Sequence, residues 1–336
     1  MKAFEIRDEF GVDALQLTER PSPTPDHGQV LMRVKAVSLN YRDLMTVKHG
    51  SARNVRLPLI PCSDGAGEVI KVGPGVTRVK PGDRVAGTFF QNWLAGDITA
   101  VHFGSALGGA IDGMLAEQVV LHEDGLVHIP DHLSYEEAAT LPCAAVTAWQ
   151  GLVTKGGLKA GDTVLVQGTG GVSIFALQFA VMTGARVIIT SSSDEKLTRA
   201  KTLGAGEAIN YKTTPDWDQP ALGFTGGEGV DHVEEVGGAG TLEKSFRVAR
   251  VGGTISLIGI LAGAAGKIDP LPVLRKGLRL QGIYVGSREM FEAMNRAIAA
   301  HQMRPIIDRV FPFVQTREAL KHMESAVHFG KIVIAL

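Results

Sequence analysis

Hydrophobic and polar residues alternate in short runs from the start of the chain to about residue 125. A period of two is typical of half-buried strands, and it predicts strands at residues 29–36, 67–72, 84–86 and 116–121, among others. Gly-Pro and Pro-Gly turns at 73–75 and 81–83 separate these runs. This part of the chain is therefore expected to be an all-β module.

From about residue 135, apolar strands alternate with segments of helical period. Helices are predicted at 135–141, 144–153, 194–203 and 241–248, and strands at 163–166, 186–190, 207–211, 232–236, 254–260 and 278–285. The tail adds a helix at 289–300, a strand at 308–313, a helix at 316–325 and a strand at 331–335. About six strands alternating with helices predict an α/β fold with a Rossmann-type doubly wound parallel sheet.

A glycine turn joins the strand at 163–166 to the helical segment that follows it. The turn reads Gly168-Thr169-Gly170-Gly171, and Ser173 stands where the pattern G-x-G-x-x-G has its last glycine. Glycines let the backbone approach a pyrophosphate, and the helix N-terminus offers free N–H groups. The turn predicts a dinucleotide site, and the alternative is a structural turn that binds no ligand.

The end of the next strand bears on which dinucleotide binds. An acidic residue there would accept hydrogen bonds from the ribose 2′-hydroxyl and repel a 2′-phosphate. The chain instead has Ser191, Ser192 and Ser193, with Lys196 close behind, and this favours NADP(H). A local alternative is a capping box, in which Ser192 and Glu195 cap the helix at 194–203. The two interpretations are compatible if they concern different serines.

Composition narrows the class of protein. The 336 residues suggest two domains, and 45% hydrophobic with 21% charged residues is ordinary for a soluble globular protein. The net charge is −1 and no basic block occurs, so the sequence lacks the basic surface that nucleic-acid-binding proteins need. Two cysteines form no disulfide framework and suit a reducing cytosol, so we expect a cytoplasmic protein. No apolar run resembles a signal peptide or a membrane span.

Several motifs together resemble the medium-chain dehydrogenase/reductase superfamily, and within it the zinc-free, quinone-oxidoreductase-like branch. They are SLNYRD (38–43), PLIPCSDGAGEVIKVGPGV (58–76), PGDRV (81–85), AATLPCAAVTAWQGL (138–152) and GKIVIAL (330–336). The resemblance implies a GroES-like β-barrel catalytic domain made of residues 1–128 and completed by 287–336. It implies a Rossmann cofactor domain at 129–286, and a homodimer in which the strand around 282–285 pairs with its copy.

The chain differs from the zinc-dependent relatives at the residues that bind their catalytic metal. Their Cys, His and Cys fall on Asn40, Ser63 and Cys143, and one thiol does not make a site that needs three protein ligands. No tyrosine is followed four places on by lysine, so the other metal-free carbonyl mechanism has no support either. Without a Lewis acid, reduction of an activated C=C bond or of a quinone is the easier chemistry, because hydrogen-bond donors stabilise the resulting anion. We therefore expect no metal.

Three residues are candidates for catalysis. Asn40 could donate to the substrate oxygen, and the alternative is an amide that satisfies backbone groups. Tyr41 could supply or orient a proton, or be a core aromatic. The resemblance places Thr147 against the nicotinamide, whereas its hydroxyl could simply bond back to a helix carbonyl. Asp43 is expected to be structural, and Arg42 to be a surface charge.

The expected cofactor residues fall in four groups. They are the turn residues Gly168, Gly170, Gly171 and Val172, the 2′-phosphate group of Ser191, Ser192, Lys196 and Tyr211, the backbone contacts Gly259, Ile260 and Leu261, and the closing residues Gly330 and Lys331. The glycine-rich segment 89–112 is expected to be either a mobile loop beside the substrate cleft, walled by Phe89, Trp93 and Phe103, or an ordinary surface loop.

The favoured function is therefore NADPH-dependent reduction of a quinone or an α,β-unsaturated carbonyl. Two enzymatic alternatives remain, a zinc-free alcohol or aldehyde dehydrogenase and an enoyl-thioester reductase. A fourth is a non-catalytic NADPH-binding sensor or structural protein.

Overall fold

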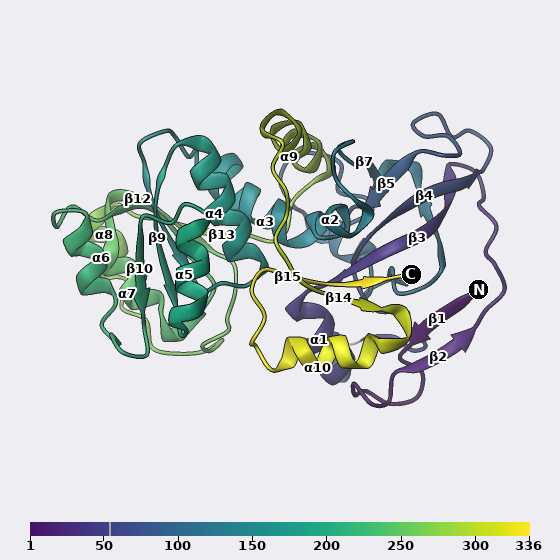
Figure 1. Ribbon diagram of the computed structural model, residues 1–336, viewed down its shortest axis with the longest axis horizontal. Helices are drawn as coiled ribbons and strands as arrows, with labels where there is room; N and C mark the ends of the chain where they lie inside the picture. The colour runs from purple at the N-terminus through teal and green to yellow at the C-terminus, as the bar shows by residue number, and fades with distance from the viewer. Residues whose placement is uncertain (54) are drawn as a thin grey trace. The chain divides into compact units, whose positions relative to one another are not determined.

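Two units make up the chain in the computed structural model, which describes residues 1–53 and 55–336 (Figure 1). The first unit is Met1–Val146 with Val285–Leu336, and the second unit is Thr147–Tyr284. Residues 129–146, expected in the cofactor domain, group with the first unit because α2 (Tyr135–Ala139) packs on its sheet.

A seven-stranded sheet forms the frame of the first unit, in the order β14-β15-β3-β4-β5-β7 with β6 also paired to β3. Its strands are β3 (Gln29–Leu39), β4 (Asp64–Val72), β5 (Arg84–Gly87), β6 (Gln118–His122), β7 (Leu126–His128), β14 (Ile307–Pro312) and β15 (Lys331–Ala335). The strands predicted from the period of two are all present. β15 runs antiparallel to β3, so the end of the chain completes the sheet that its beginning starts.

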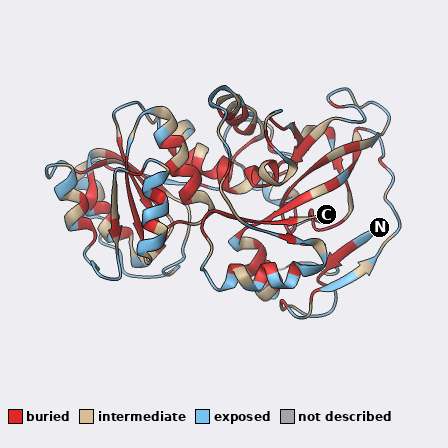
Figure 2. Cartoon of the chain, in the orientation of Figure 1, coloured by how far each residue is buried: buried red, intermediate tan, exposed pale blue. Residues whose placement is uncertain are grey.

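Smaller elements cover this sheet. A separate two-stranded sheet pairs β1 (Lys2–Glu5) with β2 (Gln16–Glu19). The helices are α1 (Tyr41–His49), α2, α9 (Arg288–His301) and α10 (Thr316–Glu324), and the short turns are η1 (Gly50–Arg53), η2 (Ala100–Ser105), η3 (Glu123–Gly125), η4 (Leu141–Ala145) and η7 (Phe313–Gln315). Apolar side chains of the strands, α1 and α10 form one core, and Figure 2 shows the strands of the sheet largely in red.

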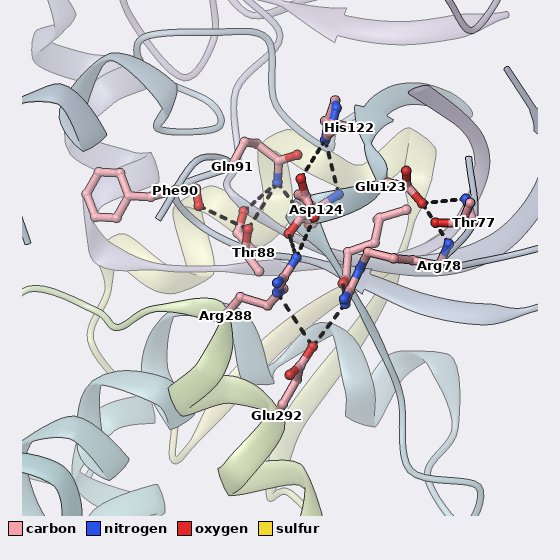
Figure 3. Close-up of polar contacts among 12 residues, drawn as sticks. Thr77, Arg78, Thr88, Phe90, Gln91, His122, Glu123, Asp124, Arg288 and Glu292 are labelled. Atoms are coloured by element: carbon pink, nitrogen blue, oxygen red, sulfur yellow. Dashed lines mark hydrogen bonds and ion pairs between the residues drawn. The ribbon is translucent and has the colours of Figure 1, made fainter. Parts of the chain in front are cut away.

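A polar network attaches the returning chain to the rest of the first unit (Figure 3). Arg288, the first residue of α9, donates to Asp124 Oδ1 (2.8 Å) and to the Asp124 carbonyl (3.0 Å). Glu292, one turn further on, accepts from Arg78 Nη2 (3.0 Å). Glu123 in turn accepts from the backbone N–H groups of Thr77 and Arg78. These contacts fix the start of α9 against η3.

The segment 89–112 packs on its own aromatic side chains. Phe90 contacts the rings of Phe89 (4.7 Å between centroids) and Phe103 (5.7 Å), and Trp93 stacks on His102. Phe89 and Trp93 are buried, so their predicted role as walls of a cleft is wrong, whereas Phe103 is half exposed. The aromatic residues serve the packing of this segment.

The second unit contains the predicted six-stranded parallel sheet, in the order β10-β9-β8-β11-β12-β13. Every neighbouring pair is parallel, which confirms the doubly wound α/β fold. The strands are β8 (Thr163–Gln167), β9 (Arg186–Ser191), β10 (Glu207–Asn210), β11 (Val230–Glu235), β12 (Ala249–Leu257) and β13 (Arg279–Gly282). β12 ends earlier than predicted because the N–H groups of Ile258 and Gly259 turn back to the Glu235 carbonyl.

Helices join these strands by crossovers. They are α4 (Gly171–Thr183), α5 (Asp194–Thr202), α6 (Asp218–Phe224), α7 (Leu242–Val248) and α8 (Leu271–Lys276), with the turn η6 (Gly238–Gly240). Right-handed crossovers place α4 and α5 on one face of the sheet and α7 and α8 on the other, because the strand order reverses at β8.

Two sequence predictions about helices need correction. The helix expected at 144–153 is interrupted, with α3 (Val146–Trp149) lying between the π-helical turns η4 and η5 (Gln150–Lys155). The cap of α5 is Ser193, whose Oγ accepts from Lys196 N (3.4 Å), and not Ser192.

Candidate functional site

Asn40 lies where β3 ends and α1 begins, in the first unit. Its backbone is extended (φ −122°), and its N–H donates to Asp43 Oδ2 (2.8 Å) in the first turn of the helix. Asp43 is fully buried, and its own N–H donates back to the Asn40 carbonyl (2.9 Å), so the two residues together cap α1. The predicted structural role of Asp43 is therefore supported by its contacts, and Asn40 is held at a fixed place.

The side chain of Asn40 belongs to a chain of hydrogen bonds. Lys331 Nζ, at the start of β15, donates to Asn40 Oδ1 (2.6 Å) and to the Leu39 carbonyl (2.7 Å). Asn40 Nδ2 donates to Ser63 Oγ (3.5 Å), and Ser63 Oγ donates to Asp64 Oδ1 (2.7 Å). The other oxygen of Asp64 accepts from the backbone N–H of Cys143 (3.0 Å).

Burial controls the charges of this cluster. It raises the pKa of Asp64 to about 6, although the Lys331 ammonium and the Ser63 hydroxyl act in the opposite direction. Burial also raises the pKa of Asp43, with Arg42 and Lys331 opposing it. The pKa of the Cys143 thiol is raised by burial and by the neighbouring Asp64, so this thiol is neutral at pH 7.

Cys62 adopts a backbone conformation that favours glycine. Its φ is +71°, and its side chain is fully buried next to Ser63. By the resemblance to the zinc-dependent relatives, Cys62 falls on the glycine of their G-H-E-G motif. Gly108 and Gly113 pass so close to the Cys62 backbone that a Cβ on either would collide with it.

The neighbours of Asn40 differ in accessibility. Tyr41, the candidate proton donor, is half exposed at the first position of α1. Arg42 is more than a surface charge, because it donates to the Leu107 carbonyl (2.7 Å) and lies over the Phe89 ring. Thr147 belongs to the second unit, where it is buried on α3.

The glycine turn of the second unit has the geometry of an anion site. Gly168 has φ +74° and closes the turn by donating to the Thr190 carbonyl (2.8 Å). Gly170 is the N-cap of α4, and a Cβ added there would meet no heavy atom within 4 Å. The first N–H groups of α4, including those of Gly171 and Val172, have no partner within the helix. The residues therefore fit a pyrophosphate in front of α4.

Most of the other predicted cofactor residues lie, like the glycine turn, at the carboxyl ends of the strands of this sheet. Because all six strands are parallel, their carboxyl ends lie along one edge. Ser191 ends β9, Tyr211 follows β10 and donates its N–H to the Ser191 carbonyl (3.0 Å), and Gly259, Ile260 and Leu261 follow β12. Ser192 and Lys196 lie at the start of α5, and Ile260 and Leu261 are largely exposed.

Gly330 and Lys331 lie in the first unit and have local roles there. A Cβ on Gly330, whose φ is +80°, would come within 2.4 Å of the Ile306 carbonyl oxygen. Lys331 is almost completely buried, with its ammonium on Asn40 and Leu39. Sequence reasoning did not find this contact, and the only signal for it was a lysine that opens an otherwise apolar strand.

Two buried carboxylates of β11 were also missed. Glu235 accepts from Gln167 Nε2 (2.7 Å), Thr241 Oγ1 (2.5 Å) and the N–H groups of Gly237 and Gly238, so it organises the end of the strand. Glu234, beside it, is buried without a hydrogen bond to either oxygen in the described part of the chain. Adjacent acids within an apolar strand (VEEV) were the available signal.

Residues 1–53 and 55–336 contain neither a metal-binding cluster nor a membrane-spanning helix. No three His, Cys, Asp or Glu side chains among them are grouped so that they could hold a metal ion. None of the helices they form is long and apolar enough to cross a membrane.

Comparisons with known proteins extend over nearly the whole chain. Residues 26–131 match the alcohol dehydrogenase GroES-like domain, and residues 171–300 match the zinc-binding dehydrogenase family. A zinc-type alcohol dehydrogenase-like protein of Schizosaccharomyces pombe is 46% identical, over 99% of both chains. A 2-methylene-furan-3-one reductase of Solanum lycopersicum is 32% identical, over 99% of this chain and 79% of that protein.

Several solved structures are similar to this chain over its whole length. A crystal structure from Sinorhizobium meliloti 1021 is similar with a TM-score of 0.93 and 42% identity, over 100% of this chain and 98% of that one. An NAD-dependent alcohol dehydrogenase gives a TM-score of 0.91 at 35% identity, over 100% of both chains. A mycobacterial protein complexed with NADPH gives 0.83 at 26% identity, also over 100% of both. With its GroES-like and Rossmann-type parts, the chain belongs to the medium-chain dehydrogenase/reductase superfamily of oxidoreductases.

Proposed function

We propose that the protein uses NADPH to reduce a quinone or an α,β-unsaturated carbonyl compound without a metal. The observation that carries this proposal is the polar chain at Asn40. A buried ammonium holds the amide of Asn40, the residue that the resemblance aligns with the first metal ligand of the zinc-dependent relatives.

The side chains present do not fit a catalytic zinc ion. Such a site needs three ligands drawn from thiolate, imidazole and carboxylate. Asn40 Oδ1 and Ser63 Oγ are already committed to Lys331 and Asp64, which leaves Cys143 as the one usual zinc ligand among these three residues. The ammonium, 2.6 Å from Asn40 Oδ1, would also repel a dication.

The chain's own groups suit conjugate reduction. NADPH, when bound, supplies the hydride. Hydride addition to the β-carbon of an enone moves negative charge to its oxygen, and the amide N–H of Asn40 is a donor for that oxygen. One preorganised donor of this kind contributes about 10²–10³ in rate. Tyr41 is our candidate for delivering or orienting the proton, and Thr147 for contacting the nicotinamide or its ribose.

The preference for NADPH rests on the carboxyl end of β9. The chain offers hydroxyls at Ser191 and Ser192, with Lys196 nearby, where an acid would repel a 2′-phosphate. Tyr211 lies beside Ser191 and is half exposed, so its ring is accessible to a ligand at this edge.

Relatives lend support to two substrate classes. One relative is a 2-methylene-furan-3-one reductase, and a mycobacterial structure of 26% identity and TM-score 0.83 is of a quinone oxidoreductase. The second candidate function is alcohol or aldehyde dehydrogenation, which is favoured by the relatives described as alcohol dehydrogenases.

Steady-state oxidation of NADPH and NADH against a panel tests the proposal. The panel contains 1,4-benzoquinone, 2-cyclohexen-1-one, benzaldehyde and crotonyl-CoA, with benzyl alcohol and NADP⁺ for the reverse direction. We expect turnover of the quinone or the enone with NADPH, in protein that elemental analysis finds free of zinc. Turnover of alcohol alone, with one zinc per chain, would replace the proposal by the second candidate. Tight NADPH binding without turnover would indicate a sensor.

We also propose that the protein forms a homodimer through β13, because the strand expected to pair around 282–285 ends at Gly282 in the structure. This strand ends the parallel sheet, pairs with β12 alone, and is exposed along its length, with Leu280 half exposed. An uncovered edge strand invites pairing with another chain. Light scattering should give twice the chain mass for the wild type and a smaller mass for Leu280→Asp, and a wild-type monomer would refute the dimer.

A further inference from the structure

The hydrogen-bond chain at Asn40 has a direction, and Lys331 sets it at one end. An ammonium has three donors and no acceptor, so the amide atom that faces it must be Oδ1. Lys331 Nζ lies 2.6 Å from that oxygen. The Nδ2 group of Asn40 must therefore point away from Lys331.

The opposite end of the chain requires the same orientation. Ser63 Oγ gives its single hydrogen to Asp64 Oδ1 (2.7 Å), so only its lone pairs remain for Asn40. A lone pair accepts from Nδ2 and not from Oδ1. Lys331 and Ser63, 268 residues apart in sequence (331 − 63), therefore both require the same orientation of the Asn40 amide.

The bond between Asn40 and Ser63 is the weakest of the chain. At 3.5 Å it is at the limit for a hydrogen bond, whereas the contact to Lys331 is short. Nδ2 also has a second N–H. The amide is therefore held firmly by its oxygen, while its donor side faces Ser63 and the carboxylate of Asp64 through weaker contacts.

The residues of this cluster differ in burial. Ser63, Asp43 and Asp64 are 0% exposed and Lys331 is 3% exposed, whereas Asn40 retains 8%. Among these five residues Asn40 has the most accessible surface. Burying a lysine is costly, and the nearby carboxylates of Asp43 and Asp64 offset part of that cost.

We propose that Lys331 is a positioning residue that holds the Asn40 amide with Nδ2 toward the substrate's carbonyl oxygen. This inference rests on the proposed function. It differs from the role expected for Lys331 on the cofactor, because two of its three N–H groups are already used within the first unit. Lys331 transfers no proton in this role, and Asn40 contributes a hydrogen bond only.

A double-mutant cycle tests the coupling between the two residues. We expect Lys331→Met to lower kcat for 2-cyclohexen-1-one, or for the best acceptor of the panel, by about 10- to 100-fold. In the Asn40→Ala background the same substitution should change kcat by less than about threefold, because residues that act as a unit are not additive. NADPH affinity, measured by fluorescence titration, should change by less than about threefold.

Other results would overturn the inference. Additive losses would mean that Lys331 does not act through Asn40, and a tenfold loss of NADPH affinity would assign it to the cofactor. Lys331→Arg, which retains the charge and the donors, should recover part of the activity if Lys331→Met folds poorly. A crystal structure of Lys331→Met separates this inference from the proposed function. Even if the wild type reduces nothing in the panel, the Asn40 side chain should be less well ordered in that structure than in the wild type, because the 3.5 Å bond to Ser63 would have to hold it without Lys331, and an equally ordered amide would refute the positioning role.

Discussion

The carboxyl group of Glu234 lies against the α-carbon of Gly151. A Cβ added to Gly151 would come within 2.9 Å of Glu234 Oε1, so a larger residue there would displace the carboxyl group. The Ser256 hydroxyl, on the neighbouring strand, donates to the Gly151 carbonyl (3.2 Å). Burial raises the pKa of Glu234 to about 8, although the Ser256 hydroxyl acts in the opposite direction.

This raised pKa predicts a loss of stability at alkaline pH. Between about pH 4.5 and 8 the folded chain keeps a proton on Glu234 that the unfolded chain releases, so the free energy of unfolding falls as pH rises through that window. A pKa difference of one unit corresponds to about 1.4 kcal/mol. We expect Glu234→Gln, which cannot ionise, to lose on the order of 3 kcal/mol less than the wild type between pH 5 and 8.5.

Urea unfolding at the two pH values measures this difference. The matched control is Glu228→Gln, an exposed glutamate of the same unit, which should follow the wild type. If Glu234→Gln also follows the wild type, Glu234 is already ionised in the folded protein.

The architecture could be predicted from sequence because it depends on local patterns. The apolar runs of β8 and β9, and the glycines between β8 and α4, indicate a parallel βαβ unit within 31 residues (193 − 163 + 1). Such signals require no knowledge of distant contacts. The breaks around α3 were missed because the apolar period of residues 144–153 does not distinguish a regular α-helix from one with π-helical turns.

The polar chain at Asn40 was only partly predictable. The sequence identified Asn40 and Ser63 as replacements for metal ligands. It could not reveal Lys331 as their partner, because β15 reaches β3 only through the pairing of the two ends of the chain. The left-handed conformation of Cys62 was hidden for a related reason, since its residue type gives no sign of a positive φ.

Cys62 provides a test of backbone strain beside the polar chain. At an ordinary position, glycine is less stable than alanine by about 0.5–1 kcal/mol. At φ +71° the order should reverse, because a Cβ in the left-handed region costs about 1–2 kcal/mol. We expect Cys62→Gly to be at least as stable as Cys62→Ala in urea unfolding. Cys143, in the helical turn η4, is the control, and there alanine should be more stable than glycine.

Gly170 separates cofactor binding from folding. Because its Cβ would enter empty space in front of α4, Gly170→Ala should leave the free energy of unfolding within about 0.5 kcal/mol of the wild type. The new methyl group would occupy the space expected for the pyrophosphate, so NADPH affinity should fall at least about tenfold. Gly223→Ala, which also meets nothing within 4 Å, is the control and should retain full affinity. Equal affinities for the two variants would remove the turn from the cofactor site.

Lys196 decides whether the edge at β9 selects NADPH. A lysine that meets the 2′-phosphate makes a charge-assisted bond that NADH cannot make, so Lys196→Ala should weaken NADPH binding by about tenfold and NADH binding much less. Lys201→Ala provides the matched control, because Lys201 is an exposed lysine in the last turn of the same helix. Titration of both cofactors against both variants gives four dissociation constants from one protocol. An equal loss of NADPH and NADH affinity in Lys196→Ala would mean that the serines and Lys196 serve the helix start alone, and the preference for NADPH would have to be abandoned.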